Sequence, residues 1–241
     1  MGHELRCVGH FFLSIPLASL LLLAACGGGD GQPVGPVVQD PEAVVLELSD
    51  LPLGLVTTGE GGIHVTNEQA CASATDENEK QACIDRLNSW GRRDHYQVMY
   101  SSNDTDAVLT GIFQILVGVS VYDTVEGAAA SFDYSAKRLE GLVKDKPDIS
   151  IVQAEKVGDE SVVWVNNTIE TMDNRDVPIS TYVVDFRRGN TIVRTQVAIA
   201  KALGSADEAV GWARRVDTKI LRVSGWQTIL GSPEPSVTAV P

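Results

Sequence analysis

The sequence predicts an α+β fold, in which amphipathic helices cover one face of an antiparallel β-sheet. Apolar residues alternate with polar ones in several stretches from residue 95 onward, which is typical of β-strands. Two of these stretches flank Gly189-Asn190, a pair that favours a two-residue hairpin turn. Two longer segments, after residues 123 and 205, carry apolar residues three or four positions apart. Strands joined by tight turns, with helices that bury one face, indicate this class.

The first strand follows His95, and its residues Tyr96, Val98 and Tyr100 share one face. The next strand, Ile112–Tyr122, is apolar on both faces, which is typical of an interior strand. Four more strands are expected at Ile149–Ala154, Ser161–Val165, Ile179–Arg187 and Thr191–Ala200. Trp164 lies in one of these alternating strands and is expected in the core.

The two long helices begin at capping sequences. Asp123-Thr124-Val125-Glu126 opens the first, and Ser205-Ala206-Asp207-Glu208 opens the second. Each helix carries one apolar stripe that can lie on a sheet. The first stripe consists of Val125, Ala129, Phe132, Ala136, Leu139 and Val143, and the second of Ala209, Ala213, Val216, Ile220 and Val223.

Shorter helices are expected before the sheet. Asp40-Pro41-Glu42 has an N-cap and a first-turn proline, and Thr66-Asn67-Glu68-Gln69 matches a capping box before Cys71. A further helix begins at residue 76, carries Cys83 and ends near Gly91. A disulfide between Cys71 and Cys83 would link these helical segments.

The alternative for these cysteines is a metal site that also uses His64 and His95. Its ligand spacing does not match the usual zinc patterns, in which paired ligands lie two to four residues apart. The disulfide is therefore the main prediction. Its closed loop would contribute about 3 kcal/mol of stability by the chain-entropy estimate.

The first 25 residues have the features of an export signal. Phe11–Ala25 is an apolar run interrupted by Pro16, and it is too short to span a membrane. The tetrad Leu23-Ala24-Ala25-Cys26 resembles the lipobox of bacterial lipoproteins. This resemblance implies cleavage before Cys26 and a diacylglyceryl group on its sulfur, so that the lipid binds the protein to a membrane outside the cytoplasm. Because Gly27 rather than Asp follows, it implies the outer membrane in a Gram-negative host and otherwise the outer face of the plasma membrane.

Composition divides the remaining chain into three parts. Residues 26–40 are rich in Gly and Pro and predict a flexible tether. Residues 41–230 are expected to form one domain, and residues 231–241 a disordered tail. Cys7 would leave with the signal peptide, so that Cys71 and Cys83 are the even pair that remains after export.

The body of the chain resembles exported bacterial domains of the PsbP/Mog1-like group, which include small actinobacterial lipoproteins and kinase sensor domains. The residues that carry the resemblance are Leu51-Pro52-x-Gly54, Asp123-Thr124-Val125-Glu126-Gly127-Ala128-Ala129, and the Arg187-Arg188-Gly189-Asn190 hairpin. The resemblance implies a binding or accessory role and no catalytic residues.

Charge and motifs narrow the possible functions. The net charge is −13, and no basic stripe is present to bind a phosphate backbone, so nucleic acid is not expected as a partner. The glycines at 61 and 62 are not followed by the Lys-Ser/Thr of a phosphate loop, and neither His64 nor His95 accompanies a Gly-x-Ser-x-Gly elbow. We therefore expect neither an enzyme nor a cofactor.

Two acidic clusters could in principle bind calcium, but they lack the ligand spacing and the distal glutamate of a calcium loop, so they are expected to form turns. These clusters are Asp104/Asp106 and Asp173/Asn174/Asp176. No metal site is therefore predicted.

Four residues are predicted as possible ligand or partner contacts. Trp212 lies at the edge of the second helix's stripe, Trp226 follows that helix, and Arg187 and Arg188 precede the hairpin turn of an otherwise acidic protein.

Three functions remain open. The first is an accessory lipoprotein that binds a small apolar ligand, a lipid or an envelope protein. The second is an envelope scaffold without a small ligand. The third is a hydrolase that uses two carboxylates, which would show as two close acids in a cleft with separated pKa values.

Overall fold

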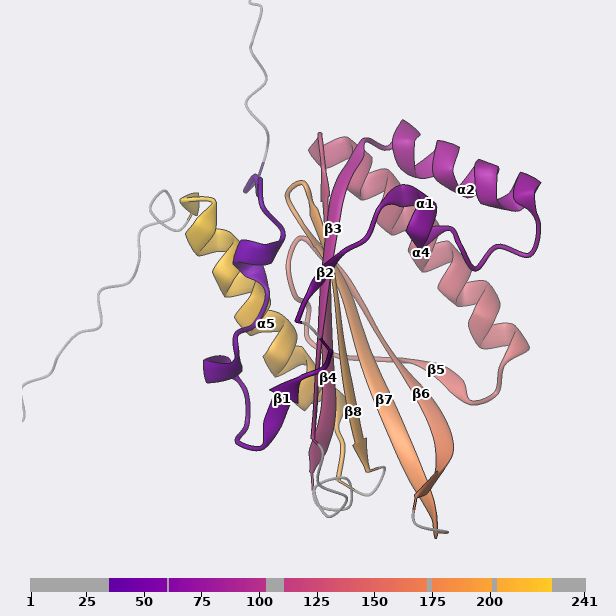
Figure 1. Ribbon diagram of the computed structural model, residues 1–241, viewed down its shortest axis with the longest axis vertical. Helices are drawn as coiled ribbons and strands as arrows, with labels where there is room; N and C mark the ends of the chain where they lie inside the picture. The colour runs from indigo at the N-terminus through magenta and orange to yellow at the C-terminus, as the bar shows by residue number, and fades with distance from the viewer. Residues whose placement is uncertain (1–34, 60, 103–110, 173–174, 201–202, 227–241) are drawn as a thin grey trace, which may run out of the picture. The chain divides into compact units, whose positions relative to one another are not determined.

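The computed structural model describes residues 35–59, 61–102, 111–172, 175–200 and 203–226, and it confirms the α+β class (Figure 1). Its centre is an eight-stranded sheet, and all strand pairs among the described residues are antiparallel. The strands are β1 (Leu55–Thr57), β2 (Ile63–His64), β3 (Arg92–Ser102), β4 (Ile112–Tyr122), β5 (Ile149–Val152), β6 (Glu160–Met172), β7 (Arg175–Arg188) and β8 (Thr191–Ala200). The helices are η1 (Glu42–Val44), η2 (Leu48–Asp50), α1 (Asn67–Ala70), α2 (Glu77–Ser89), α4 (Val125–Asp145) and α5 (Ala206–Val223).

The strand order is β1-β3-β4-β8-β7-β6-β5, with β2 paired to β3 outside this path. The interior position predicted for β4 is confirmed, because this strand pairs with β3 on one side and β8 on the other. Strands β7 and β8 form the predicted hairpin, and Gly189 in its turn has a φ of +56°. This left-handed backbone conformation is one that glycine adopts without steric cost.

Strands β6 and β7 are longer than their alternating segments predict. Their ladder runs from Glu160↔Arg187 to Met172↔Arg175. The polar pair Asn166-Asn167 and the proline at 178 interrupt the sequence pattern, but they do not interrupt the pairing. The extension is therefore a property of the paired strands and not of either segment alone.

Helix α5 covers one face of the sheet with the stripe that the sequence predicts. Its residues Ala209, Ala213, Val216 and Ile220 are fully buried, whereas Val223 at the helix end is 46% exposed. The main core lies between this helix and the strands. Sheet residues of this core include Tyr96, Val98, Ile115, Val117, Val119, Val121, Val184, Phe186, Val193 and Val197.

Helix α4 lies on the opposite face, and this corrects the prediction that helices cover one face only (Figure 1). Val119 and Val121 of β4 belong to the core under α5. Ser120 and Tyr122, which alternate with them, point to the opposite face. One of these, Tyr122, bonds through its hydroxyl to Ser131 of α4 at 2.8 Å. An amphipathic helix shows which of its own sides is buried, but not which face of the sheet it covers. The stripe of α4 agrees with the prediction, since Phe132 and Leu139 are buried.

The packed domain begins earlier than predicted, because residues 35–40, assigned to the tether, lie against it. Val38 is fully buried, and its amide donates to Asn190 Oδ1 at 2.9 Å. Asn190 Nδ2 donates to the carbonyls of Val38 at 3.1 Å and Tyr122 at 2.8 Å. These contacts fix the segment to the β7–β8 turn. The predicted signal peptide, Cys26, the earlier part of the tether and the predicted tail lie outside the described residues.

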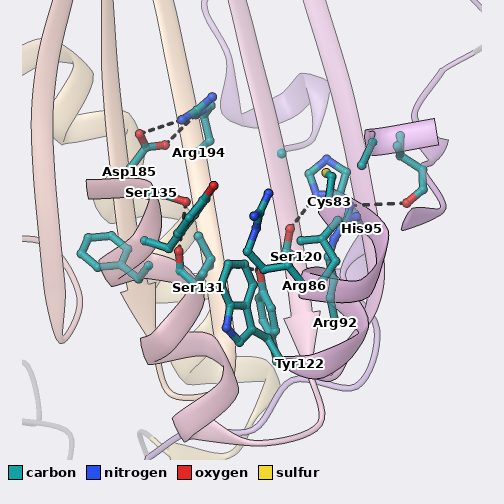
Figure 2. A pocket seen from close by; sticks show the side chains of 18 of the residues that line it. Cys83, Arg86, Arg92, His95, Ser120, Tyr122, Ser131, Ser135, Asp185 and Arg194 are labelled. Atoms are coloured by element: carbon teal, nitrogen blue, oxygen red, sulfur yellow. Dashed lines mark hydrogen bonds and ion pairs between the residues drawn. The ribbon is translucent and has the colours of Figure 1, made fainter. Parts of the chain in front are cut away.

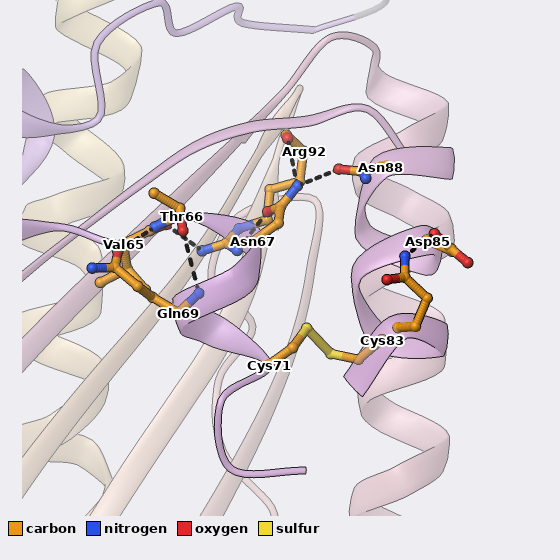
Figure 3. The surroundings of a disulfide bond; sticks show 10 residues. Val65, Thr66, Asn67, Gln69, Cys71, Cys83, Asp85, Asn88 and Arg92 are labelled. Carbon is orange, nitrogen blue, oxygen red and sulfur yellow. Dashed lines mark hydrogen bonds between the residues drawn. A yellow bond between two sulfur atoms is a disulfide. The ribbon is translucent and has the colours of Figure 1, made fainter. Parts of the chain in front are cut away.

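Helices α1 and α2 are joined by the predicted disulfide between Cys71 and Cys83, whose Cα atoms are 5.9 Å apart (Figure 3). The capping box is also confirmed, because Thr66 Oγ1 accepts from the Gln69 amide and Gln69 Oε1 accepts from the Thr66 amide. With both sulfur atoms in the disulfide, neither cysteine is available as a metal ligand. No residue of α2 is buried, so the disulfide holds a lightly packed helix.

Among the helices that the structure describes, none has the length and apolar character needed to cross a membrane.

Candidate functional site

A cleft of about 410 Å³ lies between the sheet, α4 and α2 (Figure 2). Strands β3, β4, β7 and β8 form its floor, and the two helices form its walls. This volume falls within the range of small-molecule sites. The residues that line it include Arg86, Trp90, Arg92, His95, Gln97, Gly118, Ser120, Phe132, Tyr134, Ser135, Arg138, Asp185 and Arg194.

The strand register brings the floor together from four strands. Gln97 lies opposite Gly118, Gly118 opposite Arg194, and Arg194 opposite Asp185. Directly paired residues project to the same face, so these four form one row across the sheet. Gly118 leaves a gap in this row, and a Cβ there would approach His95 Cε1 at 3.2 Å. The missing side chain makes room for the imidazole.

Asp185 is the acidic member of this row, and it is held entirely by protein donors. Arg194 Nε donates to Oδ1 at 2.6 Å and Arg194 Nη2 to Oδ2 at 2.9 Å, while Trp164 Nε1 donates to Oδ2 at 3.1 Å. Burial disfavours the charge of Arg194, but the attraction of Asp185 and its hydrogen bonds outweigh this and raise the pKa of the guanidinium. The pair is a fixed ionic element of the floor.

His95 supplies a neutral polar group. Its Nδ1 lies 2.8 Å from Ser120 Oγ. Burial lowers the pKa of the imidazole to about 4, and the nearby charges of Arg92 and Arg194 act in the same direction. At neutral pH the ring is therefore uncharged and can donate from one nitrogen and accept at the other.

A second hollow of about 600 Å³ continues along the later part of α4, where Leu139, Leu142 and Trp164 line it. Five residues line both hollows, so the two form one continuous cleft. The shared residues are Tyr134, Ser135, Arg138, Asp185 and Arg194.

Two aromatic rings and two arginines gather where α2 faces α4. The rings of Trp90 and Tyr134 have centroids 5.3 Å apart and are tilted by 54°. The Arg86 Cζ atom lies 4.4 Å from the Tyr134 centroid, and the Arg138 Cζ atom lies 5.9 Å from it. These are cation–π distances.

The four predicted contact residues lie away from this cleft. Trp212 is 8% exposed and belongs to the core under α5, with Arg215 stacked 4.2 Å from its ring. Trp226 is partly buried at the end of the described chain. Neither lines the cleft, and their role in binding remains a prediction.

Arg187 and Arg188 are engaged within the domain. Arg187 forms ion pairs with Asp159 at 3.2 Å and Glu160 at 2.7 Å. Arg188 reaches Asp159 at 2.9 Å and holds both oxygens of Asp217 at 2.7 Å. Hydrogen bonds to Asp217 and Asp159, together with the attraction of these carboxylates, raise the pKa of Arg188. These pairs join the hairpin to α5, and a partner contact through them remains a prediction.

His64 lies on the exposed strand β2 opposite Tyr96, so its side chain projects to the other face of the sheet from His95. Its Nδ1 is 3.1 Å from Asp94, and this contact raises the pKa of the imidazole. Within the described ranges, no group of three or more His, Cys, Asp or Glu residues is placed to bind a metal ion. The calcium alternatives Asp104/Asp106 and Asp173/Asn174 lie outside these ranges.

The sequence contained a signal for the cleft that periodicity did not reveal. Gly118 and Ser120 interrupt one side of an otherwise apolar strand, and Arg194 interrupts β8 on the corresponding face. Trp164, expected in the core, is partly exposed and lines the cleft instead. Polar or small residues on one face of an interior strand indicate a hollow, but only the register shows that they meet.

Comparison with known proteins supports the fold. Neither a protein-family model nor a curated protein matches the chain. The crystal structure of the extracellular domain of PknH from Mycobacterium tuberculosis is similar, with a TM-score of 0.50 and 11% identity over 78% of this chain and 98% of that one. At this identity the similarity shows a shared fold alone. A structure from Bacteroides thetaiotaomicron matches with a TM-score of 0.27 and 16% identity, over 47% of this chain and 35% of that one, which is too low to indicate a common fold.

Proposed function

We propose that this protein is an exported, lipid-anchored binding module that holds a small ligand in the cleft between α4, α2 and the sheet. The observation that carries the proposal is the cleft itself. It combines apolar and aromatic side chains with a few polar groups that the protein holds in place on the floor, which is the usual composition of a small-molecule site. The Asp185–Arg194 pair and the neutral His95 would orient the ligand.

The geometry favours binding over catalysis. Both oxygens of Asp185 are occupied by Arg194 and Trp164, so this carboxylate has little freedom to act as a base or a nucleophile. The other carboxylate that lines the cleft, Asp145, is the last residue of α4. A carboxylate hydrolase would need two close acids that face one substrate bond.

Three observations support export and anchoring. The lipobox-like Leu23–Cys26 ends an apolar leader, the Cys71–Cys83 disulfide fits an oxidising compartment, and the similar PknH structure is an extracellular domain. A lipid on Cys26 would precede the packed residues 35–40 by only about ten residues. The binding domain would then stay within a few nanometres of the membrane surface.

Ligand binding is tested by blocking the cleft. Ser135 is exposed and lines both hollows, so Ser135→Trp should fill the cleft without disturbing the core. The probe is the neutral fluorophore N-phenyl-1-naphthylamine, titrated into the purified chain. We expect saturable binding that Ser135→Trp weakens at least tenfold and that Lys137→Trp, exposed on the same helix, leaves unchanged. Equal binding by all three proteins, or no binding, would contradict the cleft function and favour a scaffold role.

Lipidation is tested in cells. We expect the wild-type chain to enter the Triton X-114 detergent phase with a diacylglyceryl group on its N-terminal cysteine. Cys26→Ala should remain in the aqueous phase, whereas Cys7→Ala should behave like wild type. Detergent partitioning of Cys26→Ala, or a trimmed N-terminus without fatty acid, would contradict the anchor.

A further inference from the structure

We propose that the ligand of the cleft is an amphipathic anion, in which a carboxylate or phosphate group on an apolar body binds to Arg86 and Arg138. The inference rests on the proposed binding function and adds the chemical class of the ligand. Its basis is the state of four arginines in the cleft. Two of them bond to polar groups of the protein, and two have no polar partner among the described residues.

Arg92 and Arg194 have polar partners. Arg92 Nη1 donates to Asn67 Oδ1 at 2.8 Å, and Arg194 forms the bidentate pair with Asp185. Each of these two arginines bonds to the protein through two of its nitrogen atoms. They belong to the rigid floor of the site.

Arg86 and Arg138 differ from them. Within the described residues, neither guanidinium makes a hydrogen bond or an ion pair, and their contacts are the aromatic faces of Trp90 and Tyr134. Figure 2 shows Arg86 beside the cleft, on the wall that α2 forms. An aromatic face contacts one side of a guanidinium and leaves its N–H edge free to donate to a carboxylate or phosphate.

The charge of the cleft contrasts with that of the protein. The whole chain has a net charge of −13, yet the hollow of 410 Å³ is lined by four arginines and one carboxylate. A positive cleft in an acidic protein attracts anions locally, while the rest of the surface repels them. The positive lining therefore favours the binding of an anion inside the cleft.

The cleft also offers a surface for an apolar body. Phe132, Leu139 and Trp164 line it beyond the two arginines, and Leu142 at its edge is 37% exposed. Arg138 and Tyr134 line both hollows, so an anion bound to the guanidinium can extend its apolar part along α4. The site therefore fits a charged head joined to an apolar body better than a free inorganic ion.

A matched pair of probes separates the charge from the body. 8-Anilinonaphthalene-1-sulfonate carries an anionic group on the ring system of N-phenyl-1-naphthylamine, which is neutral. We expect the double variant Arg86→Gln/Arg138→Gln to weaken binding of the anionic probe about tenfold or more and to change binding of the neutral probe less than twofold. Arg222→Gln, an exposed substitution on α5, is the control and should alter neither.

The outcomes distinguish this inference from the binding function. If Ser135→Trp abolishes binding of both probes but the double arginine variant binds the anionic probe normally, the cleft binds ligands and the anion inference is wrong. Parallel loss of both probes in the arginine variant, with unchanged secondary structure, would also contradict a charge-specific role. If neither probe binds the wild-type chain, the proposed binding function itself fails.

Competition identifies the source of the anion. Dodecanoate and dodecyl phosphate represent lipid-like anions, benzoate represents a small aromatic acid, and inorganic phosphate represents a free ion. We expect dodecanoate or dodecyl phosphate to displace the anionic probe at concentrations at least tenfold lower than inorganic phosphate, and uncharged dodecanol to compete poorly. Displacement by benzoate as good as by dodecanoate would assign a small acid instead of a lipid. Equal displacement by inorganic phosphate would overturn the amphipathic requirement.

Discussion

The two faces of the sheet differ in how they are closed. Under α5, the side chains interdigitate into an apolar core with many fully buried residues, and Val38 of the N-terminal segment completes it. Under α4, the sheet presents Gln97, Arg194 and Asp185, and the helix leaves a cleft above them. The main apolar core lies on the first face, and the second face carries the polar groups of the proposed binding site.

This division has a physical basis in the strands. A buried polar row cannot be closed tightly without leaving groups unpaired, whereas an apolar row is stabilised by close packing. The polar residues on the α4 face are therefore compatible with a hollow beside them. The apolar residues on the α5 face are instead stabilised by close packing. Substitutions on one face or the other test this difference in packing.

The largest effect is expected from neighbouring residues of β4. Ile115 is fully buried under α5, while Leu116 points to the α4 face and is only partly buried. We expect Ile115→Ala to lower the free energy of unfolding by about 3 to 4 kcal/mol and Leu116→Ala by about 1 kcal/mol. Urea denaturation measures both. Equal losses would show that the two faces are packed alike.

Asn190, in the β7–β8 turn, bonds to Val38 of the N-terminal segment, which packs into the core under α5. All four polar positions of its side-chain amide have partners, namely Val38, Tyr122 and Thr191. Asn190→Ala leaves several buried backbone groups unpaired and should cost about 3 kcal/mol in urea denaturation. Asn88→Ala, which removes an exposed hydrogen bond to Asn67, is the control and should cost less than about 0.5 kcal/mol. A small loss at Asn190 would mean that residues 35–40 do not stabilise the fold.

The cleft face should show a pH dependence that comes from His95. Its pKa is about 4 in the folded protein, below the ordinary value of about 6.5. As the pH falls, His95 is therefore protonated first in the unfolded chain. Its contribution to the free energy of unfolding is complete above about pH 6.5 and is lost as the pH falls toward 4. Between pH 7 and 5, the wild type should lose about 2 kcal/mol more than His95→Gln.

That comparison is made as the difference between the two proteins, because other groups titrate in the same range. His64, for example, has a raised pKa and acts in the opposite direction. Parallel stability curves for wild type and His95→Gln would contradict a depressed pKa in the cleft.

The smallest effect on global stability is expected at the wall of the cleft. No residue of α2 is buried, so the double substitution Cys71→Ser/Cys83→Ser should release this segment without unfolding the sheet. We expect a loss of about 1 kcal/mol, below the chain-entropy value of about 3 kcal/mol. Hydrogen exchange should accelerate in α2 and stay unchanged in β4. Acceleration in both would show that the disulfide supports the whole fold.

The helix stripes and caps were predictable because they depend on neighbours along the chain. Phe132 and Leu139 are buried on α4 as their spacing predicts, and Ser205 caps α5 by accepting from the Glu208 amide. The cleft was not predictable in this way. Trp164 and Trp212 illustrate the reason: both lie in periodic segments, yet the register places Trp164 in the cleft and helix packing places Trp212 in the core. Periodicity reports a buried side, but not what lies opposite it.

The sequence by itself determined the α+β class, the positions of the main helices and strands, and the pairing of Cys71 with Cys83, because these follow from local periodicity, capping and the number of cysteines. Only the tertiary structure decided that α4 and α5 lie on opposite faces, and that Gln97, Gly118, Arg194 and Asp185 meet in one row. That row depends on hydrogen-bonded register among residues up to 97 positions apart. Such long-range pairing is set by the packing of the whole sheet, which no single segment encodes.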